Sequence, residues 1–108
     1  MTGVLLQACS EADLPQRSLQ PDDCLRDVQL DQLQQALERC ERVVARYPHD
    51  PAPRNERALL LSLNGQDEAA CREIEVAHAL ARQAKPGSVD PLLASELNMR
   101  RQSCLASR

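Results

Sequence analysis

The sequence predicts an all-α protein of about four antiparallel helices joined by short loops. Three observations lead to this prediction. From about residue 28 onward, apolar residues recur at spacings of three and four. Leu, Ala, Gln, Arg and Glu dominate the chain, and an aromatic content of 1% leaves few residues that favour strands. Proline and glycine separate the periodic stretches, as they do at helix boundaries.

The first helix is expected within residues 28–47, where one face carries Leu30, Leu33, Leu37, Cys40, Val44 and Tyr47. Pro48 ends it, because proline cannot continue a helix. The second helix is expected at about residues 53–64, followed by Gly65, which can adopt a positive φ.

The third helix is expected from about residue 67 to residue 84. Asp67 and Glu68 open it, where acidic side chains favour the positive end of the helix dipole. The fourth helix begins with Asp90 as N-cap and Pro91 at the first helical position, and its apolar side extends to Cys104.

The 108 residues are expected to form one domain, preceded by a polar segment. Leu6-Gln7-Ala8-Cys9 resembles a bacterial lipobox, which implies lipidation of Cys9 and a truncated signal sequence. Residues 1–9 are then the signal remnant, 10–27 a flexible tether, 28–105 the helical domain and 106–108 a tail. The alternative is an ordinary N-terminus of a cytoplasmic protein, with Cys9 unmodified.

The stretch from about Leu33 to Cys104 resembles tetratricopeptide repeats (TPR). The family's small residues, inter-helix glycine and terminal proline are matched by Ala58, Ala70, Ala77, Gly65 and Pro48. Ala36 and Ala70 are separated by 34 residues, which is the repeat length of the family. The resemblance implies a short α-solenoid, and a generic four-helix bundle is the alternative.

This sequence departs from the family pattern at four positions. Leu61 and Ile74 stand where the family usually has aromatic residues, and Arg54 and Arg57 stand where it prefers large apolar ones. A solenoid with so few repeats and so small a core needs additional stabilisation.

Disulfides could supply that stabilisation. Antiparallel packing of the third and fourth helices would bring Cys71 toward Cys104, which leaves Cys24 and Cys40 as the second pair. Four cysteines allow three pairings, and Cys40–Cys71 is the rival. Four buried free thiols are the alternative in a reducing compartment, whereas the absence of a C-x-x-C pair disfavours a zinc site.

Several functional classes find no support in the sequence. A net charge of −3 and a single tyrosine disfavour nucleic-acid binding. No stretch approaches the roughly 18 apolar residues of a membrane-spanning helix. His49 and His78 are expected at the surface or half buried, and the helix glutamates at the surface, so no catalytic residue, metal site or cofactor is predicted.

Binding of a protein or peptide is the function that the resemblance implies. The concave face of such repeats is formed by the first helix of each unit, which here places Asn55, Leu59 and Ser62 on the face, with Asn98 or Arg101 beside them. The predicted function is a protein-interaction module or scaffold of the bacterial envelope, facing the periplasm and contacting the membrane only through Cys9. The alternative is a soluble cytoplasmic adaptor or complex subunit with free thiols.

Overall fold

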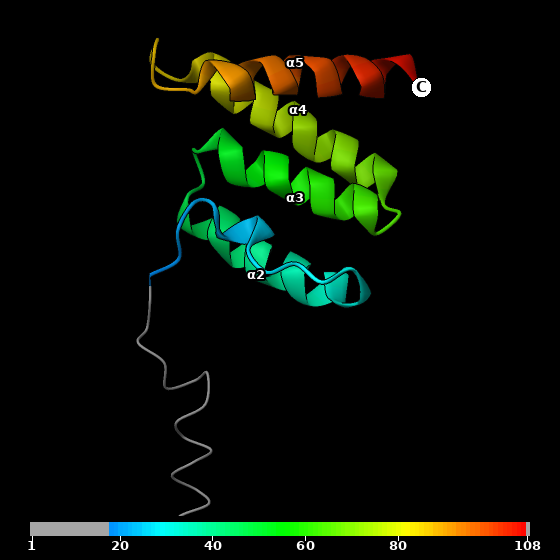
Figure 1. Cartoon of the computed structure of the whole chain (residues 1–108). Coiled ribbons are helices and arrows are strands. Elements are labelled where there is room, and N and C mark those ends of the chain that lie inside the picture. Colours follow the sequence, from blue (N-terminus) through cyan, green and yellow to red (C-terminus); the bar gives the residue numbers. More distant parts are fainter. Residues whose placement is uncertain (1–17, 108) are drawn as a thin grey trace, which may run out of the picture.

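A computed structural model describes residues 18–107 as a stack of four α-helices. These are α2 (Leu33–Arg46), α3 (Pro51–Leu63), α4 (Asp67–Gln83) and α5 (Pro91–Ala106). Each helix packs on the next one in the chain, so the stack runs from α2 at one end to α5 at the other (Figure 1). Residues 18–107 contain no strand, and the predicted all-α fold with about four helices is confirmed.

Helices α3 and α5 begin in the same way, with an aspartate followed by a proline. Asp50 and Asp90 each accept a hydrogen bond of 2.9 Å, from the backbone N–H groups of Ala52 and Leu92 respectively. The proline that follows has no N–H to satisfy and its φ already suits a helix. The predicted start of α5 is correct, whereas α3 begins two residues before Pro53 because Asp50 caps it.

Helix α2 begins later than the apolar spacing suggests. Asp27 has a φ of 54°, which a continuous α-helix does not allow. A 3-10 turn, η3 (Leu30–Gln32), leads into the helix instead. Leu30 is 73% exposed, so it is not part of the apolar helix face on which the sequence spacing placed it.

The packed part of the chain extends further toward the N-terminus than the predicted boundary at residue 28. The 3-10 helix η2 (Asp23–Leu25) lies against α2 and α3. Leu19 packs on the core, and its carbonyl oxygen accepts a 2.6 Å hydrogen bond from the Tyr47 hydroxyl. Residues 18–27 are thus part of the folded unit, and the rest of the expected tether, like Cys9, lies outside the described residues.

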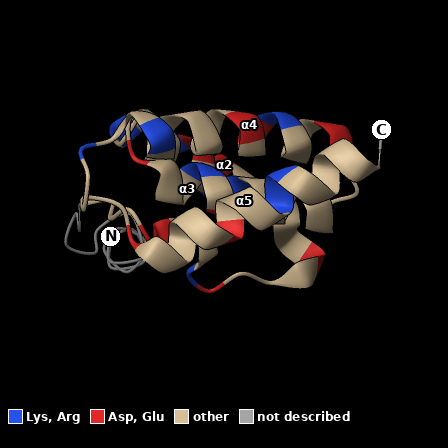
Figure 2. Cartoon of the chain, turned by 90° about the horizontal axis from the view of Figure 1, so that it is seen from above, with Lys and Arg blue, Asp and Glu red and all other residues tan. Residues whose placement is uncertain are grey.

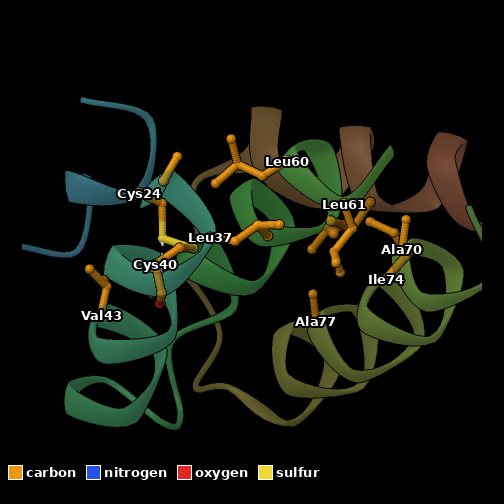
Figure 3. Packing of buried hydrophobic residues seen from close by; sticks show 12 residues of the cluster. Cys24, Leu37, Cys40, Val43, Leu60, Leu61, Ala70, Ile74 and Ala77 are labelled. Atoms are coloured by element: carbon orange, nitrogen blue, oxygen red, sulfur yellow. Dashed lines mark hydrogen bonds between the residues drawn. A yellow bond between two sulfur atoms is a disulfide. The ribbon is translucent and has the colours of Figure 1, made fainter. Parts of the chain in front are cut away.

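The core is built from aliphatic side chains of every helix (Figure 3). Its largest fully buried members are Leu60, Leu97, Val43, Pro53, Cys24 and Cys40. Tyr47, the single aromatic residue of the chain, is only partly buried at the edge. Because aliphatic side chains bury less area than aromatic ones, this core supplies modest stabilisation for its length.

Two disulfides cross-link the stack near its two ends. Cys24–Cys40 joins η2 to α2, and both cysteines are 0% exposed. Cys71–Cys104 joins the start of α4 to the last turns of α5, with 5.8 Å between the Cα atoms. These are the two pairs that the antiparallel arrangement favours over the rival Cys40–Cys71.

Candidate functional site

A groove runs between α3 and α5 and is floored by α4. It is an open hollow of about 310 Å³. Its lining combines small and aliphatic side chains with hydroxyls and charges: Ala58, Leu59, Ser62, Asp67, Ala70, Cys71, Ile74, Arg100, Ser103, Cys104 and Ser107. A second open hollow of about 590 Å³ adjoins it and shares Asp67, Ser107 and the Cys71–Cys104 disulfide. The disulfide therefore borders both hollows and fixes α5 relative to α4 there.

Two of the four predicted partner-binding residues, Leu59 and Ser62, line this groove together. Asn55 does not line the groove, and the residue is only 7% exposed. Its Nδ2 donates a 3.0 Å hydrogen bond to Glu96 on α5. Asn55 thus ties α3 to α5 through its Nδ2, and its Oδ1 is buried without a hydrogen-bond partner among the described residues.

Arg101, the fourth predicted residue, lies on a different side of α5. Its Nε pairs with Glu75 of α4 at 3.1 Å, and it borders a separate hollow with His78. Asn98 lies on this side too, with its Oδ1 3.0 Å from the His78 ring. The prediction that Arg101 joins Leu59 and Ser62 is wrong, because one residue along a helix turns the side chain by about 100°.

Arg100 takes the place that the sequence assigned to Arg101. It lines the groove, its Nε pairs with Glu96 at 3.2 Å, and its Nη1 donates to the Asn55 carbonyl at 3.5 Å. The spacing in the sequence does not separate the two positions. Residues 100 and 101 lie three and four after the buried Leu97, and four and three before Cys104.

Glu56 on α3 is a carboxyl group whose pKa is raised far above its usual value. It is half-buried on α3, and its Oε1 atom is buried without a hydrogen-bond partner among the described residues. Burial, reinforced by the negative charges of Asp22, Asp50 and Glu96, raises its pKa to about 7. The Glu56 carboxyl therefore takes up a proton near neutral pH.

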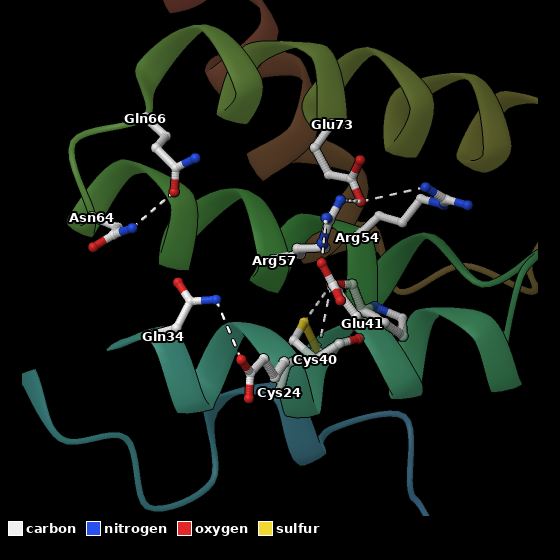
Figure 4. A network of polar contacts seen from close by, with 11 residues as sticks. Cys24, Gln34, Cys40, Glu41, Arg54, Arg57, Asn64, Gln66 and Glu73 are labelled. Atoms are coloured by element: carbon white, nitrogen blue, oxygen red, sulfur yellow. Dashed lines mark hydrogen bonds and ion pairs between the residues drawn. A yellow bond between two sulfur atoms is a disulfide. The ribbon is translucent and has the colours of Figure 1, made fainter. Parts of the chain in front are cut away.

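A network of ion pairs connects α2, α3 and α4 (Figure 4). Glu73 of α4 pairs with Arg54 at 3.3 Å and with Arg57 at 3.2 Å, both on α3. Arg57 also reaches Glu41 of α2 at 3.4 Å. The Glu73 side chain is only 8% exposed, so the expectation that it lies on the surface is wrong. The carboxylate of Glu73 thus lies between the two arginines of α3 and pairs with both.

The described residues show no arrangement typical of a metal centre or a membrane span. No group of three or more His, Cys, Asp and Glu within residues 18–107 could hold a metal ion. None of the helices in that range is long and apolar enough to cross a bilayer. His49 is exposed and His78 partly buried, as the sequence predicted.

No protein-family model, curated protein or solved structure matches this chain.

Proposed function

We propose that this chain is a protein-interaction module that binds a peptide segment of another protein in the groove between α3 and α5. The composition of the groove carries this proposal. Leu59, which is partly exposed, offers apolar contact, whereas Ser62, Ser103 and Arg100 offer hydrogen-bonding groups. A bound peptide needs both, because its side chains seek apolar pockets and its backbone seeks donors and acceptors.

The proposed architecture is a short TPR-like solenoid. Ala36 and Ala70, one repeat length apart, are 3% and 4% exposed, and Ala58 and Ala77 are buried as well. Gly65 has a φ of 77° at the turn between α3 and α4, where the family pattern has glycine. In such an arrangement α3 and α5 would be first helices of successive units, and the groove between them would be the ligand face.

The proposed location is an oxidising compartment, in the more specific form of a bacterial envelope with the chain anchored through a lipid on Cys9. The two disulfides support the compartment, since such bonds persist outside reducing cytosol. Intact-mass analysis of the protein from its own cells tests the anchor: a diacylglyceryl mass that disappears in Cys9→Ser is expected. An unmodified Cys9 with four further free thiols would instead support the cytoplasmic adaptor.

Peptide selection tests the binding groove directly. Peptides of about 12 residues are selected by phage display on the disulfide-bonded protein, and their affinities are measured by fluorescence anisotropy. Ser62→Arg places a long side chain in the groove without disturbing the core, because Ser62 is exposed. We expect it to weaken binding at least tenfold.

The matched control is Gln35→Arg, an exposed position on α2 that does not line the groove. It adds the same charge and should leave the affinity unchanged. Equal affinities for wild type, Ser62→Arg and Gln35→Arg would refute the groove as the binding site.

A further inference from the structure

The two disulfides differ in their access to solvent. Cys24 and Cys40 are 0% exposed, and the carbonyl oxygen of Pro53 lies 3.8 Å from the sulfur atom of each. Cys71 and Cys104 are partly exposed, and both line the two open hollows of about 310 and 590 Å³. Because an attacking thiolate must reach a sulfur atom of the bond, the second disulfide is open to exchange and the first is not.

The last turns of α5 depend on the exposed disulfide. Cys104 is the one residue among 102–107 that is not exposed. No hydrogen bond or ion pair from residues 102–107, all of which the structure describes, reaches another helix. These turns carry no charged residue either (Figure 2, tan ribbon beside the label C). The bond to Cys71 is therefore what holds this segment on α4.

The earlier part of α5 has other attachments. Leu97 is 0% exposed in the core, and Leu93 packs against the same core. Arg101 pairs with Glu75 of α4 at 3.1 Å, just before the segment 102–107 begins. Breaking the disulfide thus frees the helix end and leaves the rest of α5 in place. A helix end of fewer than two turns is not stable without tertiary contacts.

We propose that the Cys71–Cys104 disulfide is a site of thiol–disulfide exchange with a dithiol protein, and that its reduction releases residues 102–107 from α4. The Cys24–Cys40 disulfide stays closed and keeps η2 on α2. The chain then has two redox forms that differ at one end of the stack.

The exchange follows two balanced steps. A thiolate of the dithiol protein attacks one sulfur atom, the S–S bond breaks, and the other cysteine leaves as a thiolate that takes up a proton. The second thiol of the partner then loses its proton and attacks the mixed disulfide, which releases the first cysteine. Two electrons pass to the chain, and the partner becomes a disulfide. An oxidised partner restores the bond by the same steps in reverse.

The proximity of the two cysteines selects a dithiol over a monothiol as the partner. Their Cα atoms lie 5.8 Å apart, so the cysteine freed in the first step lies beside the mixed disulfide and can displace the attacking thiol again. A second thiol on the partner competes with this return, whereas a monothiol such as glutathione cannot.

The released segment contributes to the groove between α3 and α5. Ser103, Cys104 and Ser107 line that groove, so the reduced form loses part of one wall. An effect on peptide affinity rests on the proposed function. The two measurements that test the exchange site do not.

Differential alkylation tests the site of exchange. The full chain carrying Cys9→Ser, with both disulfides intact, is incubated with reduced thioredoxin as the dithiol protein, or with glutathione at the same thiol concentration. Samples are quenched with iodoacetamide, and each cysteine is followed by peptide mass spectrometry. We expect thioredoxin to reduce the exposed pair at least about tenfold faster than the buried pair, and faster than glutathione does.

Reduction by dithiothreitol in concentrated urea is the control, because unfolding exposes all four sulfur atoms. The two pairs should then react at similar rates. Native protein in which thioredoxin leaves Cys71–Cys104 intact, or reduces Cys24–Cys40 as fast, would overturn the proposal. Glutathione that matches thioredoxin would overturn the choice of a dithiol partner.

Hydrogen–deuterium exchange tests the release of the helix end. Protein reduced only at Cys71–Cys104 is compared with the oxidised protein, and Cys71→Ser combined with Cys104→Ser gives the same comparison without a reductant. We expect the amides of residues 103–107 to exchange about tenfold faster or more, and those of α2 to stay unchanged.

The matched control is Gln102→Ser, an exposed position on the same turns of α5 that leaves the disulfide in place. It should not change the exchange of residues 103–107. Unchanged exchange of these amides after reduction, or an equal increase in α2, would contradict the local release of α5.

Discussion

Glu56→Gln should stabilise the protein at alkaline pH and leave it unchanged at acidic pH. The pKa of Glu56 rises from 4.5 to about 7 on folding, chiefly because the carboxyl is buried. Between these values the unfolded chain releases the proton and the folded chain keeps it, so stability falls as pH rises. A shift of this size corresponds to about 3 kcal/mol, and partial exposure to water reduces that to about 1–2 kcal/mol.

Urea unfolding followed by far-ultraviolet circular dichroism, with both disulfides intact, measures this effect from pH 4 to pH 8.5. The difference in unfolding free energy between Glu56→Gln and wild type should be near zero at pH 4. It should grow through pH 5–7 and level off above pH 7. Glu38→Gln, at an exposed site on α2, is the control that changes the same chemical group away from the core. A Glu56→Gln difference that stays constant with pH would refute the reasoning.

Three further variants probe the fold. Replacing both Cys71 and Cys104 by serine opens a loop of sequence separation 33 and should lower the unfolding free energy by about 3–4 kcal/mol, measured by urea unfolding without reductant. Asp50→Ala removes the cap of α3 and should cost about 1 kcal/mol in the same assay, with Asp31→Ala, at an exposed site before α2, as the control. Glu73→Ala leaves two arginines without their shared carboxylate and should cost about 1–3 kcal/mol. Unchanged stability in any of the three would show that the contact in question contributes little.

The helices could be predicted because their boundaries depend on local chemistry. Asp90 and Pro91 start α5, and Gly65 follows the end of α3, through contacts with residues next to them in the chain. The structure confirms both of these predicted boundaries. The start of α2 could not be found this way. Leu30 continues the apolar spacing, yet the positive φ of Asp27 interrupts the helix, and nothing in the spacing shows that.

The candidate site was harder to predict because its residues come from different helices. Leu59 and Ser62 follow from the face of α3 alone, and they do line the groove. Choosing between Arg100 and Arg101 needed the packing of α5 against α3 and α4, because both residues lie within about one turn of the buried Leu97. The raised pKa of Glu56 depends chiefly on its burial and then on the negative charges of Asp22, Asp50 and Glu96. These contributions come from separate parts of the chain, so no periodic pattern in the sequence predicts them.

The two disulfides close loops that follow one another along the chain without overlapping. One spans residues 24–40 and the other residues 71–104, so residues 41–70 lie outside both. If the oxidised chain is pulled from its ends, the segment between the two loops can extend by about 100 Å, and neither loop can open. That segment contains the whole of α3, which forms one wall of the groove. Mechanical tension would thus dismantle the binding groove while both cross-linked ends of the molecule remained closed.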